Sequence, residues 1–157
     1  MSAIRKSARK GFTLVEILIV VIILGILAAI VIPQFTNASS DARNSSLAST
    51  LQTLRSQIEL YKLQHGDTLP NLTTATGSWA PFTGTTTYGN PAQTFGPYMQ
   101  AVPTNPENGF STVVDSTASP GTTVTAGTGF TYDYNSGNGT GEIYGTSDTV
   151  GTTVASY

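Results

Sequence analysis

The most apolar stretch of the chain runs from Phe12 to Ile32, and its 21 residues are interrupted only by one threonine, one glutamate and one glycine. As a helix rising about 1.5 Å per residue, this stretch would measure about 31 Å, which matches the hydrocarbon thickness of a bilayer. We therefore predict a membrane-spanning helix over residues 12–33, in which Glu16 is the only charged side chain.

The next stretch is polar but keeps a helical period. Five apolar residues follow one another at intervals of four, three, four and three positions: Leu47, Leu51, Leu54, Ile58 and Tyr61. This spacing places them on one face of a helix, so residues 34–66 are predicted to be an amphipathic continuation. Gly66 and Pro70 indicate where the helix ends. The two halves together would form one helix about 80 Å long, and the Ser- and Asn-rich stretch between them leaves a kink or break open.

The remainder, residues 67–157, is predicted to be a globular head made of a loop and a small sheet. Residues 67–97 are rich in Thr, Gly, Pro and Asn, so we expect a long loop with one short strand or turn of helix. Aromatic side chains are expected to hold this loop on the head: Trp79, Phe82, Tyr88 and Phe95. Four later segments have strand-like composition: 110–114, 122–125, 129–134 and 141–144.

Alternating side chains in "GFTYDYN" predict how the sheet packs. Phe130, Tyr132 and Tyr134 alternate with Thr131 and Asp133, which indicates one aromatic face and one solvated face. An antiparallel sheet laid on the apolar stripe of the long helix would bury both apolar faces. The expected fold class is therefore α+β, with a long N-terminal helix packed on a small C-terminal antiparallel β-sheet.

Charge is distributed as unevenly as hydrophobicity. The chain has seven basic and nine acidic residues, and four of the basic ones lie within the first ten positions. Without residues 1–11, three basic side chains face nine acidic ones, a net charge of −6. Such a body has no basic patch for phosphates, so nucleic acid is not an expected partner. The basic N-terminus instead predicts a cytoplasmic N-terminus, with the C-terminal body across the membrane.

The N-terminal segment differs from a secretory signal peptide. A signal peptide has a shorter apolar core that is followed by a small-residue cleavage site. Here the small residue precedes the apolar stretch, at Lys10-Gly11-Phe12, so the apolar segment is expected to be kept. The chain contains no cysteine, which excludes disulfide scaffolds, thiolate metal sites and cysteine nucleophiles.

The motif "KGFTLVE" at positions 10–16, followed by the apolar stretch with Pro33 near its end, resembles the N-terminus of type IV pilins and type II secretion pseudopilins. In that family a membrane peptidase cuts after the glycine and methylates the new N-terminal phenylalanine. The resemblance implies a leader peptide at 1–11, cleavage between Gly11 and Phe12, N-methylation of Phe12, and Glu16 as the assembly carboxylate. It also implies a pilin-like fold.

The energetic cost of the Glu16 carboxylate in a membrane can be offset by a positively charged partner. An acidic residue near a membrane centre costs roughly 2.5–3.5 kcal/mol, whereas an ammonium about 4 Å away contributes up to about 4 kcal/mol at an effective dielectric of 20. Cutting after Gly11 creates such an ammonium at Phe12, and helix geometry favours the amine of a neighbouring copy over the residue's own. We therefore predict that Glu16 docks an incoming subunit; the alternative is a harmless glutamate near the interface.

Small residues on the apolar helix admit two interpretations. Gly25 and Ala29 are four positions apart on one face, a pattern that lets membrane helices approach closely. Gly25 can equally mark a point where the helix stretches or unwinds, and Pro33, which lacks a backbone donor, can serve the same purpose. The sequence leaves packing and flexibility as alternatives.

A weaker resemblance covers the later chain. "ELYKLQHGDTLPNL" followed by "YMQAVPTNPENG" is similar to the major pseudopilin of type II secretion, whose turn carries Asp where this chain has Asn105. That family's late calcium loop would fall at "NSGNGTGEIYGTSD", with candidate oxygen ligands Asp133, Asn135, Asn138, Glu142 and Asp148. Because an expected Asp is Asn138 and the spacing fits poorly, we favour a Gly-rich hairpin and expect no metal or other cofactor. The absence of the disulfide that is common in type IV pilins favours a pseudopilin, or a pilin that is stabilised in another way.

An enzyme is not expected. His65 is the only histidine, and it lacks neighbours for a metal or catalytic site, so we interpret it as a hydrogen-bonding or positive side chain at a helix C-terminus. No Gly-rich phosphate loop or Ser-His-Asp constellation is present, and nothing in the spacing of acids such as Asp115 and Asp133 indicates a carboxylate pair.

The predicted function is that of a structural subunit that polymerises through its N-terminal helix into a type IV pilus-like filament or a type II secretion pseudopilus. The alternative is a membrane-anchored minor pilin or binding module that presents Thr- and Gly-rich loops. The resemblance implies these partners: other copies of the chain, the prepilin peptidase, an inner-membrane assembly platform with its ATPase, and lipid before assembly. The implied location is the bacterial inner membrane, then a periplasmic pseudopilus or an extracellular surface filament.

Overall fold

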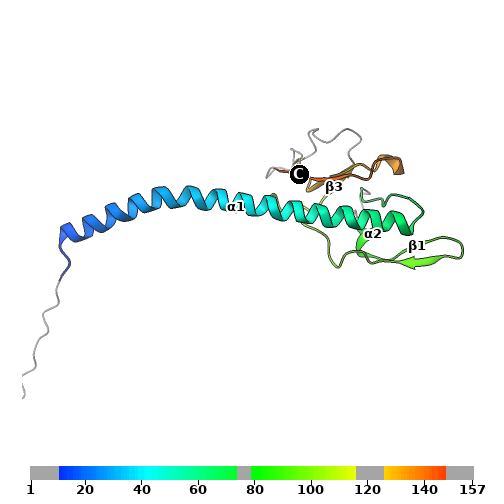
Figure 1. Cartoon of the computed structure of the whole chain (residues 1–157), viewed down its shortest axis with the longest axis horizontal. Coiled ribbons are helices and arrows are strands. Elements are labelled where there is room, and N and C mark those ends of the chain that lie inside the picture. The colour runs from blue at the N-terminus through cyan, green and yellow to red at the C-terminus, as the bar shows by residue number, and fades with distance from the viewer. Residues whose placement is uncertain (1–10, 74–78, 116–125, 148–157) are drawn as a thin grey trace, which may run out of the picture. The chain divides into compact units, whose positions relative to one another are not determined.

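The computed structural model describes residues 11–73, 79–115 and 126–147 (Figure 1). Contacts within the chain divide it into two units, Met1–Ser39 and Ser40–Tyr157. The first unit contributes the N-terminal part of helix α1, and the second contributes the rest of α1 and the sheets.

Helix α1 spans Leu14–Gln64 without a break, although Pro33 lies inside it. The predicted single helix is therefore confirmed, and the break left open between its halves does not occur. The helix starts two residues later than expected, because Thr13 caps it. Its end matches the prediction: Gly66 has a φ of +60°, and the Asp67 amide donates to the Lys62 carbonyl oxygen at 2.9 Å. This 6→1 hydrogen bond with a left-handed glycine is a Schellman-type helix end.

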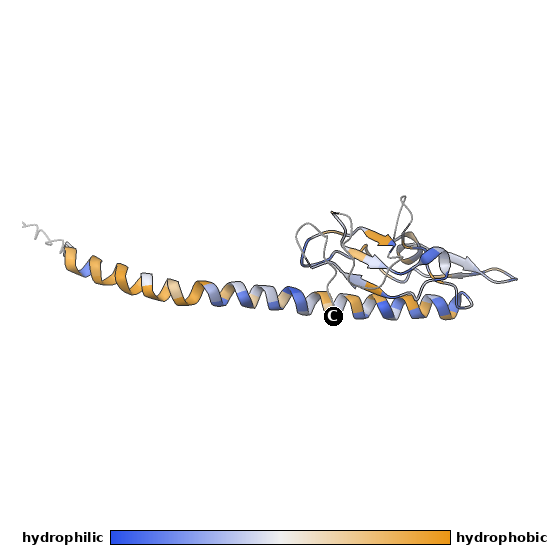
Figure 2. Ribbon diagram, turned by 90° about the horizontal axis from the view of Figure 1, so that it is seen from above, coloured by the Kyte–Doolittle hydropathy of each residue, from blue (hydrophilic) through white to orange (hydrophobic). Residues whose placement is uncertain are grey.

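The described residues of the second unit form an apolar core built on the predicted helical stripe. Leu47, Leu51, Leu54 and Ile58 of α1 are buried, and Tyr61 packs against the same core. The other members come from the loops and strands: Leu69, Leu72, Trp79, Phe82, Val113, Phe130, Tyr132 and Ile143. Figure 2 shows apolar and polar residues alternating along this part of α1, whereas the N-terminal part is almost uniformly apolar.

A three-stranded sheet supplies the strands of this core. It consists of β3 (Val113–Asp115), β4 (Phe130–Tyr132) and β5 (Ile143–Gly145), in that order across the sheet. The α+β class is confirmed, and three of the four expected strand segments each contain or overlap a strand. The segment 122–125 lies outside the described residues. A Cβ at Gly145 would lie 2.7 Å from Leu47 Cδ1, so glycine lets β5 approach α1 closely.

Two expectations about this sheet need correction. The sheet is mixed, because β3 pairs with β4 in parallel while β4 pairs with β5 antiparallel. A parallel pair requires a long connection between its strands, and residues 116–129 supply the length. Thr131 was expected on a solvated face but is buried, like both of its neighbours in β4. β4 is the central strand of the three, and the alternating pattern did not reveal that both of its faces are covered.

The segment expected to be one long loop contains more regular structure than predicted. A short helix, α2 (Ala80–Thr83), is followed by a two-stranded antiparallel ribbon of β1 (Thr86–Tyr88) and β2 (Gln93–Phe95). Trp79 and Phe82 are buried in the core as expected. Tyr88 is instead exposed by 43% and Phe95 is half-buried, so the ribbon is held to the head less deeply than its aromatic content indicated.

Candidate functional site

The predicted cleavage position lies immediately before α1. Gly11, Phe12 and Thr13 have non-helical backbone, and Phe12 is 78% exposed. A Cβ added to Gly11 would meet no atom within 4 Å. The peptide bond between Gly11 and Phe12 is therefore outside the helix and open on the described side, which is the geometry that a peptidase needs.

Thr13 and Glu16 form the first turn of α1. The Thr13 Oγ1 accepts a hydrogen bond from the Glu16 backbone amide at 3.2 Å. This contact satisfies one of the donors that a helix leaves unpaired at its start, and the Thr-x-x-Glu spacing is that of a capping box. The Glu16 side chain is exposed in the first turn, where a negative charge is favoured by the helix dipole. The sequence analysis missed the role of Thr13, although the Thr-x-x-Glu pattern could have revealed it.

The apolar surface beyond Glu16 is exposed on all sides. Every Leu, Ile and Val from Leu14 to Ile32 is at least 40% exposed within the chain. Each such side chain gains roughly 1.5–3 kcal/mol when it is removed from water. The described residues include one helix long and apolar enough to cross a membrane by length and composition. The segment therefore needs a lipid or protein environment that the described residues do not provide.

The residues predicted for helix packing or flexibility lie along the same exposed surface. A Cβ at Gly25 would meet nothing within 4 Å, so the glycine makes no close packing contact with the other described residues. Ala29 is exposed as well. The helix is regular at Gly25 and continues through Pro33, and the Thr36 hydroxyl donates to the Ile32 carbonyl oxygen at 3.3 Å one turn later. Packing against another helix and flexibility both remain predictions.

His65 is a buried hydrogen-bonding residue at the end of α1. Its ring stacks on Tyr61 with centroids 3.9 Å apart, and Nδ1 lies 3.0 Å from the Tyr61 carbonyl oxygen. Because a carbonyl oxygen only accepts, Nδ1 carries the proton, and Nε2 can accept from the Thr86 hydroxyl 3.0 Å away. The expectation of a hydrogen-bonding side chain at the helix C-terminus is confirmed, and the residue also ties the β1–β2 ribbon to α1.

Two of the candidate calcium ligands, Asp133 and Glu142, already accept hydrogen bonds within the protein. The Asp133 carboxylate accepts from the Thr140 amide at 3.0 Å and from its hydroxyl at 2.8 Å, and Glu142 accepts from the Tyr144 hydroxyl at 2.6 Å. Among the described residues no group of three His, Cys, Asp or Glu side chains is placed to hold a metal ion. Asp148 lies outside them. Asp115 accepts hydrogen bonds from the backbone amides of Tyr134 and Asn135.

Asn105 fills a position that requires an amide. The side chain is fully buried, and its Nδ2 donates to the carbonyl oxygens of Gly129 and Thr146 at 2.7 and 2.8 Å. Its Oδ1 accepts from the Glu107 amide at 2.9 Å, which fixes the orientation of the amide group. The residue thereby joins the turn before β3 to the ends of β4 and β5, a role that an ionised aspartate could not fill.

A comparison with protein families identifies the N-terminal segment. Residues 6–32 match the prokaryotic N-terminal methylation motif. The match contains the whole of "KGFTLVE" and nearly all of the exposed apolar surface. The resemblance to the pilin and pseudopilin family, predicted from these residues, is confirmed over this part of the chain.

Several curated relatives carry names from the same two classes. The chain is 36% identical over 61 residues to type II secretion system core protein G of Klebsiella michiganensis, covering 39% of this chain and 43% of that protein. It is 36% identical over 61 residues to the protein of the same name from Pseudomonas aeruginosa, with the same coverage. It is 50% identical over 54 residues to type IV major fimbrial protein FimA of Dichelobacter nodosus, covering 34% of this chain and 35% of that protein.

These matches cover less than half of the chain and less than half of each relative. No solved structure matches the chain. The similarity to known proteins therefore concerns the methylation motif and the exposed apolar helix.

Proposed function

We propose that the chain is a structural subunit that polymerises through its N-terminal helix into a type IV pilus-like filament or a type II secretion pseudopilus. The observation that carries the proposal is the apolar surface from Phe12 to Ile32, which is exposed on all sides and interrupted by a single carboxylate. A helix of this kind lies in lipid or among other helices. The methylation motif in the same residues supports packing among other helices once the chain has been processed.

Processing is the first step. A prepilin peptidase cuts between Gly11 and Phe12, removes residues 1–11, and methylates the Phe12 amine. The exposed, non-helical backbone at both residues supports this assignment, because a protease requires an extended substrate. The cut leaves the new amine one residue before Thr13, the residue that caps α1.

Assembly then pairs two charges in an apolar medium. The Glu16 carboxylate of a subunit in the filament receives the Phe12 amine of an incoming copy. In a site of effective dielectric near 20, two such charges about 4 Å apart attract by up to about 4 kcal/mol. The contact registers the new subunit along the filament axis, and the apolar surfaces around it supply most of the burial.

Other partners and the location follow from the same proposal. Before assembly the helix crosses the bacterial inner membrane with its basic end in the cytoplasm, surrounded by lipid. An inner-membrane assembly platform driven by its ATPase extracts the subunit into a periplasmic pseudopilus or an extracellular filament. Relatives with secretion and fimbrial names both match, which supports the general class and leaves the two kinds of filament as alternatives.

The deciding experiment is electron microscopy of the sheared surface and periplasmic fractions, combined with N-terminal sequencing of the polymer. We expect filaments whose subunit begins with N-methylated Phe12. A chain that keeps Met1, or that never sediments as a polymer when the peptidase is present, would contradict the proposal. Recovery of the chain only as a trace component at filament tips would favour a minor pilin instead.

A further inference from the structure

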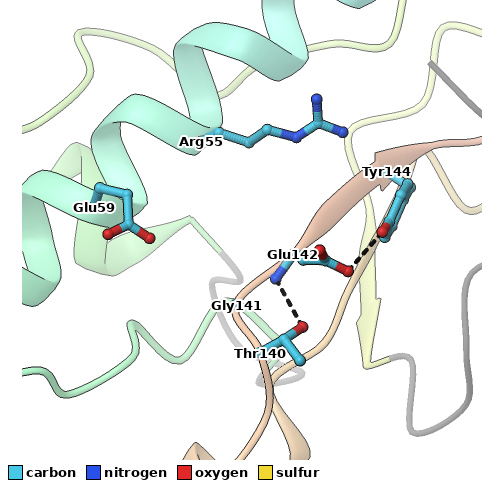
Figure 3. A pocket seen from close by; sticks show the side chains of 6 residues that line it. All are labelled: Arg55, Glu59, Thr140, Gly141, Glu142 and Tyr144. Atoms are coloured by element: carbon cyan, nitrogen blue, oxygen red, sulfur yellow. Dashed lines mark hydrogen bonds between the residues drawn. The ribbon is translucent and has the colours of Figure 1, made fainter.

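A polar pocket of about 230 Å³ lies between α1 and the turn leading into β5 (Figure 3). Its lining residues come from both elements: Arg55, Glu59, Thr140, Gly141, Glu142 and Tyr144. Glu59 is ion-paired with Lys62 at 3.1 Å, and Arg55 offsets the charge of Glu142, so the pocket has no net charge. Its electrostatics therefore select no charged partner, and the first turn of α1 gives the stronger functional signal.

One side chain fixes where α1 begins. The Thr13 carbonyl oxygen accepts the first backbone hydrogen bond of the helix, from the Ile17 amide at 3.3 Å. The Glu16 amide lies one residue earlier, and it donates to the Thr13 hydroxyl oxygen at 3.2 Å. If α1 began one residue earlier, that amide would bond to the carbonyl oxygen of Phe12 instead. The hydroxyl therefore takes the place of the Phe12 carbonyl and stops the helix from extending.

The position of this cap matters because the proposed cleavage site comes immediately before it. Gly11 and Phe12 have non-helical backbone, and the Phe12 side chain is 78% exposed. Extending α1 to Phe12 would wind one side of the scissile bond into the helix. A protease binds the bond that it cuts as extended chain, so a wound bond must first be released. The cap keeps this bond in the form that a protease can bind.

An apolar environment makes the cap more important. A backbone amide without a partner is costly in lipid, so the Glu16 amide is favoured to find an acceptor within its own chain. Neither Leu14 nor Val15 carries a side-chain acceptor. The Thr13 hydroxyl oxygen can accept and leave Phe12 outside the helix, whereas the Phe12 carbonyl oxygen can accept only if Phe12 joins the helix. The choice between these two acceptors decides whether the cleavage site is extended or helical.

We propose that Thr13 is a positioning residue for processing: its hydroxyl caps α1 and thereby holds the Gly11–Phe12 bond outside the helix for the prepilin peptidase. The inference rests on the proposed function, because it requires cleavage at this bond. It adds a chemical requirement at position 13, which needs a side chain that accepts a hydrogen bond from the amide three residues later. Serine and asparagine meet this requirement, and valine, which matches threonine in shape, does not.

Cleavage of the full-length precursor by purified prepilin peptidase in detergent tests this role. Thr13→Val keeps the shape of the side chain and removes the acceptor. We expect kcat/KM to fall roughly three- to tenfold, within the range of losses measured for helix N-caps. The change should appear in KM while kcat is kept, because a chain whose scissile bond is wound into the helix does not bind, and the fraction competent to bind sets the apparent affinity.

Rescue variants separate capping from recognition of the threonine itself. Thr13→Ser and Thr13→Asn keep an acceptor, so both should be cut at close to the wild-type rate, although asparagine differs from threonine in shape. Thr36→Val is the matched control, because the Thr36 hydroxyl donates to the Ile32 carbonyl oxygen and caps nothing, and its cleavage should be unchanged. The NMR shift of the Phe12 Cα reports the backbone directly, and it should move toward the helical value in Thr13→Val alone.

The outcomes separate this inference from the proposed function. If the peptidase does not cut the wild-type precursor between Gly11 and Phe12, the proposed function fails. If it cuts the wild-type chain and Thr13→Val with the same KM, the positioning role is wrong and the cleavage assignment stands. If Thr13→Asn loses as much as Thr13→Val or more, the peptidase recognises residue 13 itself, and the capping role is overturned.

Discussion

Leu24 and Leu54 are the same residue type on the same helix, yet their surroundings are opposite. Leu24 is 59% exposed in the first unit, and Leu54 is fully buried in the core of the second. Around Leu24 the helix is apolar on every side; around Leu54 apolar residues form one stripe that faces the sheet. The helix therefore belongs to two cores, one completed within the chain and one that requires lipid or other copies.

In the proposed polymer, this difference would let one helix serve both the folding of the head and the association of copies. A complete core in the second unit keeps the head folded whatever happens to the first unit. The incomplete apolar surface in the first unit would, in the proposed polymer, supply association without disturbing the head. Substitutions in one region should therefore leave the property of the other region unchanged, and the following experiments test that separation.

The largest effect is expected from a matched pair of leucine substitutions. Leu54→Ala should lower the free energy of unfolding of the head by about 2–5 kcal/mol, because it leaves a cavity in a closed core. Leu24→Ala should change it by less than about 0.5 kcal/mol. Unfolding of the full chain in detergent can be followed through Trp79, the only tryptophan, which is buried against Phe130. Equal destabilisation by both variants would contradict the separation.

Glu16→Gln should affect assembly and spare the head. Removing a charge pair worth up to about 4 kcal/mol should reduce the rate of filament formation at least tenfold. The Trp79 unfolding transition should not move, since Glu16 lies outside the core. Asp41→Asn, which also removes a carboxylate from an exposed position on α1, serves as the control. Filaments of Glu16→Gln that grow at the normal rate would exclude the docking role.

Asn105→Asp tests a position where the amide group is essential to the head. An ionised carboxylate would face two carbonyl oxygens at 2.7 and 2.8 Å, so we expect a loss of about 1–3 kcal/mol at pH 7. The new carboxyl group would have a raised pKa in the folded state, because only its protonated form can donate. The variant should therefore regain stability as the pH falls below 7, whereas a pH-independent loss would argue against this explanation.

The smallest effect is expected from chelation. Since Asp133 and Glu142 are occupied by Thr140 and Tyr144, adding EGTA should shift the thermal midpoint of the head by less than about 1 °C. Differential scanning calorimetry with and without calcium measures this directly. A calcium-dependent rise of several degrees would show that the late loop binds the ion, and it would make the stability of the head dependent on a ligand as well as on its core.

The local sequence pattern was sufficient to predict those features that do not depend on tertiary contacts. The apolar stretch, the Leu and Ile stripe and the Gly66 stop predicted α1 almost to its ends, because helical period and capping are local properties. The methylation motif was also readable, since it is a contiguous stretch. The Thr13 cap was readable in principle and was missed.

Long-range pairing could not be read in the same way. The parallel pairing of β3 with β4 and the burial of Thr131 each depend on which segments meet in space. The ribbon of β1 and β2 pairs residues that are close in sequence, and there the sequence analysis expected only one short strand or turn of helix. The pocket beside Arg55 unites residues almost 90 positions apart, such as Arg55 and Glu142. Asn105 was noted only as a departure from a family pattern, and its role emerged from contacts with Gly129 and Thr146.

By itself, the sequence determined that this chain has an apolar helix with one carboxylate near a cleavage motif, because the hydrophobicity of a segment follows from its composition and spacing alone. Only the tertiary structure decided how the head closes: which strands pair, that Asn105 must be an amide, and that Arg55, Glu59 and Glu142 share one pocket. The physical reason is range. Hydrophobic period and helix capping act over a few residues, whereas strand pairing and pocket electrostatics depend on residues that only folding brings together.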